Sequence, residues 1–373
     1  MTGVVDCALA ALDAAAGAAG VTDVVSPALM AALRAISDAS DDGDASFQDA
    51  ALARGLLGKL CGVIRRVQAP YVWGAVGDVC VWEGLPEAAR RRIAGAIDVP
   101  RVVACMAHPA SGTLEVFSCM RCLATLAAHA GPSLVQSGAC QTFASVAFRY
   151  HYSGSPWSAE IRGAAVMFLH GFLGITDNCE HAPDFFIGGN SLLVTDSRVR
   201  AVAGSGLVAL ALLSLRDGEE QLIHDALRCL RRLFGAVAAL RMFGHEIVES
   251  DGASALLACA RRFPDCEKVA LVCLLLFAKA TTPEVVPAGT AIRRACAGDA
   301  ALIVRGVLRV HYSVLAAKVC VFVLQSTQGS AGQSPCVAVD IMAKLLRFGG
   351  ADARVDGAAA GRAVVFAVTA FRG

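Results

Sequence analysis

Apolar residues recur at helical spacing along most of the chain, and the clearest case is the segment 222–234. Leu222, Ala226 and Leu230 lie one helical turn apart, and further apolar residues beside them complete the i, i+3, i+4, i+7 pattern of an amphipathic helix. A helix this short is marginal alone and is stabilised by packing on neighbours. The pattern therefore predicts short helices that pack side by side.

This helical pattern occurs twice in succession between residues 199 and 278. Small and apolar positions repeat at an offset of 46 residues in the pairs Gly206/Gly252, Ala209/Ala255 and Leu210/Leu256. Others repeat at an offset of 44 residues in the pairs Ala226/Ala270, Leu230/Leu274 and Leu233/Phe277. A period in this range with helical spacing inside each unit is typical of stacked helical repeats. We expect the glycines to allow a sharp chain reversal, because glycine adopts positive φ without steric cost.

The same reasoning predicts elements along the whole chain. Helices are expected over 4–19, 28–37, 47–66, 87–94, 99–107, 113–128, 139–151, 159–173, 222–234, 300–311 and 314–324. Residues 69–86 look less regular, and Gly95, Gly138 and Gly298 align with the turn glycine Gly206. Residues 175–197 are rich in turn-forming residues and are expected to form an inserted loop with an apolar tip at Phe185, Phe186 and Ile187.

These elements suggest three regions. We expect residues 1–92 to be an N-terminal helical, capping region with a degenerate first repeat. Residues 93–326 would hold the repeats, with the insert at 175–197, and residues 327–373 would be C-terminal capping helices. Because each repeat contacts only its neighbours, the stability of such a chain is a sum of neighbouring interfaces.

Composition narrows the class of protein. With 373 residues the chain is long for one compact core. Hydrophobic residues make up 56% of it, and many of them are alanine, which suits close helix packing. The net charge of +1 gives no global field that would favour nucleic acid, and no apolar run reaches the roughly 18 residues of a membrane span. Many of the 15 cysteines lie in apolar helical patterns, as free buried thiols do. We therefore expect a reducing compartment, the cytoplasm or alternatively the nucleus.

The repeated unit resembles the armadillo repeat. The stretches "AVAGSGLVALALLSL", "IVESDGASALLACA" and "LVQSGACQTFASVA" carry the resemblance, each followed by a segment like "DALRCLRRLFG". It covers most of 95–324, and HEAT-type repeats are the near alternative. The resemblance implies an all-α fold, a right-handed α-solenoid superhelix whose third helices line a concave groove for partner proteins.

Many armadillo proteins bind extended peptides through asparagines on the third helices, and this chain departs from that pattern. The aligned positions hold no asparagine; they are Lys59, Thr125, Gly171, Arg232, Leu276 and Val323. A side-chain amide both donates to and accepts from a peptide backbone, which leucine and valine cannot do. The groove candidates that remain are mostly cationic: Lys59, Arg121, Thr125, Arg162, Arg228, Arg231, Arg232, Lys268 and Lys279. They favour a partner with acidic segments, and the alternative is that they are solvated helix-end cations.

Candidate catalytic or metal-binding sets are weak. Cys119 and Cys122 form a CxxC near Cys105 and His108, but the motif lies inside an apolar helical pattern, which favours buried thiols. The segments 149–153 and 309–313 share the residues Arg-x-His-Tyr-Ser, which suits a helix C-terminus. No P-loop, nucleophile elbow, HExxH or dinucleotide fingerprint occurs. We therefore predict no catalytic residue, no metal and no cofactor.

The most direct functional hypothesis is a non-enzymatic scaffold that binds a partner protein along its groove, and not nucleic acid or a membrane. A second hypothesis is a regulatory segment that resembles the armadillo regions found beside kinase or GTPase modules and acts through the 175–197 insert. A third is an enzyme on a helical-repeat scaffold, such as a chromophore lyase related to HEAT-like proteins.

Overall fold

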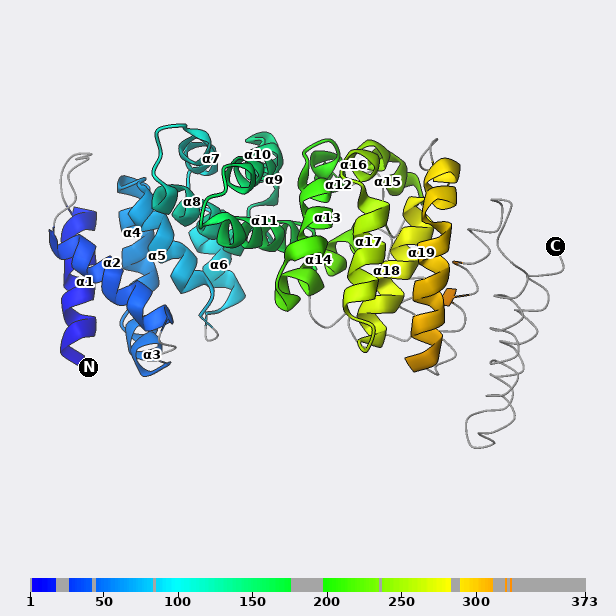
Figure 1. Ribbon diagram of the computed structural model, residues 1–373. Helices are drawn as coiled ribbons and strands as arrows, with labels where there is room; N and C mark the ends of the chain where they lie inside the picture. The colour runs from blue at the N-terminus through cyan, green and yellow to red at the C-terminus, as the bar shows by residue number, and fades with distance from the viewer. Residues whose placement is uncertain are drawn as a thin grey trace. The chain divides into compact units, whose positions relative to one another are not determined.

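The structure, a computed structural model, describes residues 2–17, 27–41, 45–82, 85–175, 197–234, 237–282 and 289–310, with 319, 320 and 323. These residues form nineteen helices and no strand (Figure 1). They divide into two compact units: unit 1 comprises residues 1–177 with 205–207, and unit 2 comprises 178–204 with 208–373. The predictions for most of the insert and for the C-terminal capping helices fall on residues outside the described ranges.

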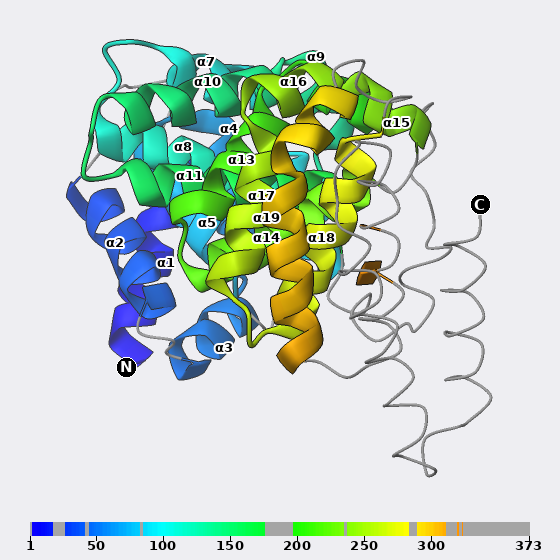
Figure 2. The ribbon, with the colours of Figure 1, turned by 45° about the vertical axis from the view of Figure 1, so that its right-hand side comes forward.

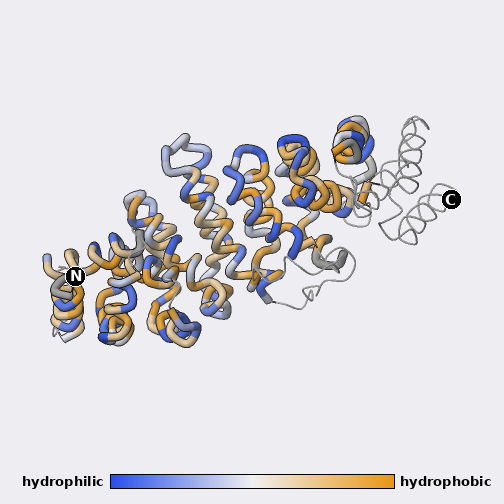
Figure 3. Tube along the Cα trace, turned by 90° about the horizontal axis from the view of Figure 1, so that it is seen from below, coloured by the Kyte–Doolittle hydropathy of each residue, from blue (hydrophilic) through white to orange (hydrophobic). Residues whose placement is uncertain are grey.

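Unit 1 is built from repeats of three helices. The third helices are α2 (Pro27–Asp41), α5 (Pro70–Cys80), α8 (Thr113–Leu126) and α11 (Ser158–Phe172). The second helices are α1 (Thr2–Gly17), α4 (Leu56–Arg66), α7 (Val99–Ala107) and α10 (Ala139–Tyr152). The short first helices are α3 (Ala45–Ala53), α6 (Glu87–Ala94) and α9 (Gly131–Gln136). Along most of these helices hydrophobic and hydrophilic residues alternate, as the colours of the tube in Figure 3 show.

The third helices of unit 1 form a continuous stack. Helix α5 packs against both α2 and α8, and α8 packs against α11. Glycines allow the close approach: a Cβ on Gly74 would lie 3.0 Å from Ser118 Oγ, and one on Gly77 would lie 3.3 Å from the backbone nitrogen of Cys122. These two glycines let α5 lie against α8 at a distance that larger residues would prevent.

Aromatic rings fill the core where α10 packs on α11. The Phe143 and Phe168 rings are stacked with centroids 3.9 Å apart, and Phe172 lies 5.4 Å from Phe168. All three side chains are fully buried. Such rings bury large apolar areas and provide much of the stability of a helical interface.

Unit 2 continues the three-helix organisation. Its helices are α12 (Ser197–Val202), α13 (Leu207–Asp217, in this unit from Val208), α14 (Glu220–Leu233), α15 (Val237–Met242), α16 (Gly244–Glu249), α17 (Gly252–Arg262), α18 (Glu267–Ala280) and α19 (Gly289–Val310). Helix α18 packs against α17, α14 and α19. No helix in the described part of the chain has the length and apolar character needed to cross a lipid bilayer.

The turns before the second helices α4, α10, α13 and α17 contain residues in the left-handed region. The predicted role of glycine is confirmed at Gly138 (φ 69°) and Gly206 (φ 91°). At Gly95 the φ is −72°, and at Gly252 the positive φ of 50° falls on the preceding residue, Asp251. Aspartate tolerates this conformation. Gly252 serves packing instead, since a Cβ there would lie only 2.7 Å from Leu212 Cδ1.

The prediction of one long helix over 47–66 is wrong. Gly55 has a φ of 85° and separates α3 from α4. This break shifts the assignment of the first repeat: α4 is a second helix, and the third helix is α5, in the segment 69–86 that looked irregular. Helix α5 is buried along most of its length, so its apolar residues show no one-sided pattern.

The prediction of a turn at Gly298 is also wrong. Helix α19 runs without interruption from Gly289 to Val310, so a first and a second helix are fused there. No heavy atom lies within 4 Å of a Cβ built on Gly298. The residue therefore fits a straight exposed helix as well as a turn, and the alignment of small residues could not distinguish the two.

Candidate functional site

Several predicted cations gather at the C-terminal ends of two neighbouring third helices in unit 2. We call Arg228, Arg231 and Arg232 of α14, with Lys279 of α18, the α14–α18 basic cluster. The three arginines are three and four residues apart, so they share one side of α14. Helix α14 packs on α18, and the last turn of each helix is basic.

The electrostatics of Lys279 show that positive charge is crowded in this cluster. Burial lowers the pKa of Lys279 below its usual value, and the positive charge of Arg231 lowers it further. The charged amine is therefore less stable here than in water. An anion placed beside Arg231 and Lys279 would remove part of this cost.

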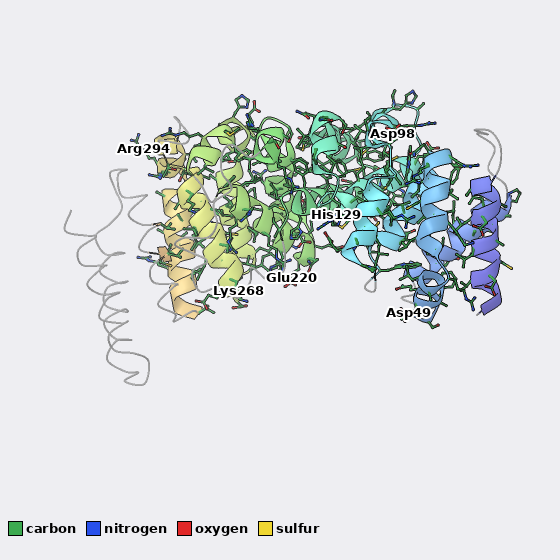
Figure 4. All side chains as sticks on the ribbon, turned by 180° about the vertical axis from the view of Figure 1, so that it is seen from behind. Asp49, Asp98, His129, Glu220, Lys268 and Arg294 are labelled. Atoms are coloured by element: carbon green, nitrogen blue, oxygen red, sulfur yellow. The ribbon has the colours of Figure 1, made fainter. Side chains whose placement is uncertain are left out.

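The acidic groups of α14 lie toward its other end. Asp225 accepts a hydrogen bond from Arg228 Nη1 at 3.2 Å and one from Gln221 Nε2 at 3.2 Å. Figure 4 shows Glu220 and Lys268 at the same end of α14 and α18, in their first turns. Lys268 is exposed, and the helix rise places it about 16 Å along α18 from Lys279. Lys268 therefore does not belong to the cluster.

In unit 1, Arg121 forms an ion pair between helices. Its Nη1 lies 2.7 Å from Oδ1 of Asp78, which is 4% exposed on α5. Ser37 of α2 donates a hydrogen bond to the other carboxylate oxygen of Asp78. A buried carboxylate requires such partners. These contacts link α2, α5 and α8, so the first role of Arg121 is to join three stacked helices.

Two further groove candidates lie on third helices of unit 1, where Thr125 is half-buried and Arg162 is buried. The Thr125 hydroxyl donates to the backbone oxygens of Arg121 and Cys122 in its own helix, at 3.1 and 3.0 Å. Arg162 of α11 is 5% exposed.

Lys59 does not lie on a third helix, and that part of the prediction is wrong. It lies on α4 and forms an ion pair with Asp13 of α1. The reason is the break at Gly55, which makes α4 a second helix that packs on α1. The loop candidates Phe185, Phe186 and Ile187 lie outside the described residues.

The cysteines of the CxxC are core residues. Cys119 and Cys122 are fully buried in α8, and burial raises the pKa of both thiols. Protonated, inaccessible thiols are poor nucleophiles and poor metal ligands. Within the described ranges, no group of three or more His, Cys, Asp or Glu side chains is placed to hold a metal ion.

A buried glutamate in unit 2 was missed by sequence reasoning. Glu246 of α16 is 7% exposed, and its carboxylate accepts hydrogen bonds from the backbone N–H groups of Gly204 at 2.8 Å and Ala209 at 3.3 Å. Ala209 lies in the first turn of α13, where N–H groups lack partners within the helix. In the sequence Glu246 resembles any helix-surface acid, and only its spatial neighbours reveal this role.

Comparisons with known proteins support the fold and do not assign a family. No protein-family model matches the chain, and no curated protein matches it. Among solved structures, an engineered protein matches with a TM-score of 0.54 and 14% identity, over 100% of this chain and 98% of that one. A structure concerning a phosphorylation switch that controls the interaction between cadherin and beta-catenin matches with a TM-score of 0.50 and 12% identity, over 98% of this chain and 78% of that one.

At this level of identity a likeness shows the fold alone. Together with the stacked three-helix repeats, it places the chain among the α-solenoids. The predicted all-α solenoid fold is confirmed.

Proposed function

We propose that this protein is a non-enzymatic, armadillo-type scaffold that binds an acidic segment of a partner protein at the α14–α18 basic cluster. The armadillo assignment is supported by the three-helix repeats and by the likeness to the structure from the cadherin and beta-catenin interaction. Fold alone does not assign a function, so the proposal depends on the site.

One observation carries the proposal: two packed third helices, α14 and α18, both end in basic residues. Attraction of each cation to its own helix C-terminus explains why basic residues occur in these last turns. It does not explain why two cations on different helices lie close enough for one to lower the pKa of the other. Carboxylates of an extended segment that crosses α14 and α18 would interact favourably with Lys279, whose charged form is disfavoured by burial and by Arg231.

The first test is charge reversal at the cluster. We expect the double variant Arg231→Glu, Lys279→Glu to bind an oligoglutamate peptide at least about tenfold more weakly than the unchanged protein, because two attractive charges become repulsive. Isothermal titration calorimetry at low and at moderate salt measures the difference. Binding by the unchanged protein should weaken as salt is added, because exposed charges are screened.

The matched control changes the net charge of unit 2 equally. Arg261 on α17 and Arg294 on α19 are both exposed and lie outside the cluster. The variant Arg261→Glu, Arg294→Glu should keep most of the affinity for oligoglutamate. Equal losses in the two double variants would show that net charge, and not this cluster, attracts the peptide.

The second test uses the titration of Lys279 itself. The folded-state pKa of Lys279 lies below the usual value of a lysine, so with rising pH the folded protein releases this proton before the unfolded chain does. Between those two pKa values the unfolded state binds more protons, and the contribution of Lys279 to stability rises with pH. We expect oligoglutamate to raise the pKa of Lys279, as followed by NMR of a ¹³C-labelled lysine ε-carbon. A peptide that binds and leaves this titration unchanged binds elsewhere.

The partner itself is best identified by affinity capture from the native source, with the charge-reversed protein as the comparison sample. The regulatory hypothesis depends on the 175–197 insert, of which residues 176–196 lie outside the described ranges, and it stays a prediction. The lyase hypothesis is favoured by no site among the described residues. The cytoplasmic or nuclear location also stays a prediction.

A further inference from the structure

Two repeats, one in each unit, carry a pair of cysteines at equivalent positions. In unit 1 these are Cys105 of α7 and Cys119 of α8, and in unit 2 they are Cys259 of α17 and Cys273 of α18. Each pair is 14 residues apart, and the second pair follows the first by 154 residues. The helices α8 and α18 are offset by the same 154 residues at both ends, so these two repeats align without a gap.

The two thiols of each pair meet between packed helices. Helix α7 packs on α8, and α17 packs on α18, as Figure 2 also shows. The side chain of Cys119 is hydrogen-bonded to that of Cys105, and the side chain of Cys273 to that of Cys259. Sulfur atoms at this range need only a small approach to reach the length of about 2.05 Å of a disulfide bond. The packing of a second on a third helix therefore places two disulfide partners side by side in each repeat.

Access to solvent distinguishes the two pairs. Cys105 is half-buried, whereas its partner and both cysteines of the second pair are fully buried. The Cys105 sulfur lies 3.8 Å from Oγ of Ser111, in the connection between α7 and α8. Residues 108–110 and 112 of this connection are exposed. A small polar oxidant can therefore reach Cys105 from this side, and in the second pair neither sulfur is accessible.

Burial also sets the order of reaction within the first pair. It raises the pKa of the Cys119 thiol, so this thiol is protonated and does not react first. Cys105 is the member that an oxidant meets. Acidity without access is not enough, and the second pair illustrates this. The hydrogen bond with Cys273 lowers the pKa of Cys259, but the sulfur of Cys259 is out of reach of solvent.

From these features we propose that Cys105 and Cys119 form a reversible oxidation site, which hydrogen peroxide converts into a disulfide between α7 and α8. The Cys105 thiolate attacks one peroxide oxygen and the O–O bond breaks. Cys105 becomes a sulfenic acid, and the released hydroxide takes up the proton of its thiol to form water. The Cys119 sulfur then attacks the Cys105 sulfur and the S–O bond breaks. The departing hydroxide takes the Cys119 proton to form a second water, so the two thiols lose the two electrons that the peroxide gains.

The proposed site suits the compartment expected from the sequence. Disulfides in reducing compartments are usually transient, and many sense oxidants. Two molecules of a small thiol would restore the site by thiol–disulfide exchange, as they are themselves oxidised to their disulfide. While it lasts, the bond ties the second helix of one repeat to the third. The inference does not depend on the function proposed for the α14–α18 basic cluster.

Peptide mapping of the full chain tests the site. The folded protein is treated with hydrogen peroxide, its remaining thiols are alkylated in urea, and it is digested without reductant by trypsin and a protease that cleaves after glutamate. Cleavage at Glu115 separates Cys105 from Cys119 unless a disulfide joins them. We expect the joined peptides to accumulate with peroxide dose and to disappear on reduction. Cys259 and Cys273 should be recovered alkylated at the same doses.

Variants separate the roles of the two cysteines. Cys105→Ser, at a half-buried position, should abolish the disulfide and leave Cys119 reduced. Cys119→Ala should stop the reaction at the sulfenic acid, which dimedone then labels at Cys105. The matched control is Cys122→Ala, which removes another fully buried thiol from α8 and should still form the disulfide. Far-UV circular dichroism checks that each variant is folded, and Cys105→Ser keeps the test decisive if a core variant is not.

Three results would overturn the proposal. The first is the absence of joined Cys105 and Cys119 peptides at peroxide doses that oxidise the exposed Cys7. The second is equal oxidation of Cys259 and Cys273, because access to solvent would then not select the site. The third is a folded Cys119→Ala protein without a dimedone label at Cys105, because Cys105 would then not be the thiol that peroxide attacks.

Discussion

Replacing Phe168 by alanine is expected to lower the free energy of unfolding of unit 1 by about 4 kcal/mol, within the range seen when a buried phenylalanine is truncated. The ring is fully buried and lies between Phe143 and Phe172, at 3.9 and 5.4 Å. Its removal opens a cavity between α10 and α11, two elements that cannot move closer without disturbing neighbouring repeats. Urea unfolding followed by tryptophan fluorescence measures the change, because all three tryptophans lie in unit 1.

The comparison variant for this prediction is Phe168→Leu. Leucine fills much of the same volume. Phe168→Leu should therefore lower the free energy of unfolding by less than Phe168→Ala does, with a difference of at least about 1 kcal/mol. Met167 is the next residue on the same helix and is 40% exposed, so Met167→Ala should change stability by no more than about 0.5 kcal/mol. If Phe168→Ala and Met167→Ala gave similar changes, the aromatic core of unit 1 would not be packed as described.

Replacing Glu246 by alanine is expected to destabilise unit 2 by about 3 kcal/mol. The substitution removes a buried carboxylate and leaves the N–H groups of Gly204 and Ala209 without that acceptor. Hydrogen bonds to a charged group each contribute about 1.5–3 kcal/mol, and unsatisfied buried donors carry a further cost. Glu246→Gln keeps one acceptor oxygen and should lose less. Far-UV circular dichroism measures the change, since unit 2 contains no tryptophan.

A matched control lies on the same helix. Glu249 of α16 is also paired, with His245 Nδ1 at 2.9 Å, but both side chains are largely exposed. Glu249→Ala should therefore change stability by no more than about 0.5 kcal/mol. The two variants lose the same charge from the same helix, so a difference between their stabilities reports the burial of Glu246 and not its charge. Comparable losses in the two variants would contradict the role assigned to Glu246.

The α14–α18 basic cluster depends on charge, so its affinity for oligoglutamate should fall with added salt.

Much of the fold follows from local pattern. The helices α6 and α7 begin and end as the spacing of apolar residues predicts, and α8, α10, α11 and α14 differ from the prediction by no more than two residues at either end. Most of these segments are amphipathic, and that asymmetry is visible in the sequence. Segments buried on several sides lack it, which is why α5 was not recognised.

The candidate cations show where local pattern stops being informative. The sequence identifies Lys59, Arg121, Arg162 and Lys279 as charged residues on helices, and nothing in their spacing separates them. The structure gives each a different environment: an ion pair with α1, an ion pair between stacked helices, burial, and crowding beside Arg231. Each environment is created by a residue at least 40 positions away in the chain, apart from the burial of Arg162.

By itself the sequence determined that this chain is a stack of short amphipathic helices with a period near 45 residues, because helical periodicity and turn chemistry act over a few residues. Only the tertiary structure decided which helix belongs to which layer, which carboxylates are buried, and which cations and aromatic rings meet. Those outcomes depend on neighbours in space. The left-handed residue Gly55 separates α3 from α4, which makes α4 a second helix and α5 a third helix. No local pattern shows which side chain of the next repeat a given residue will contact.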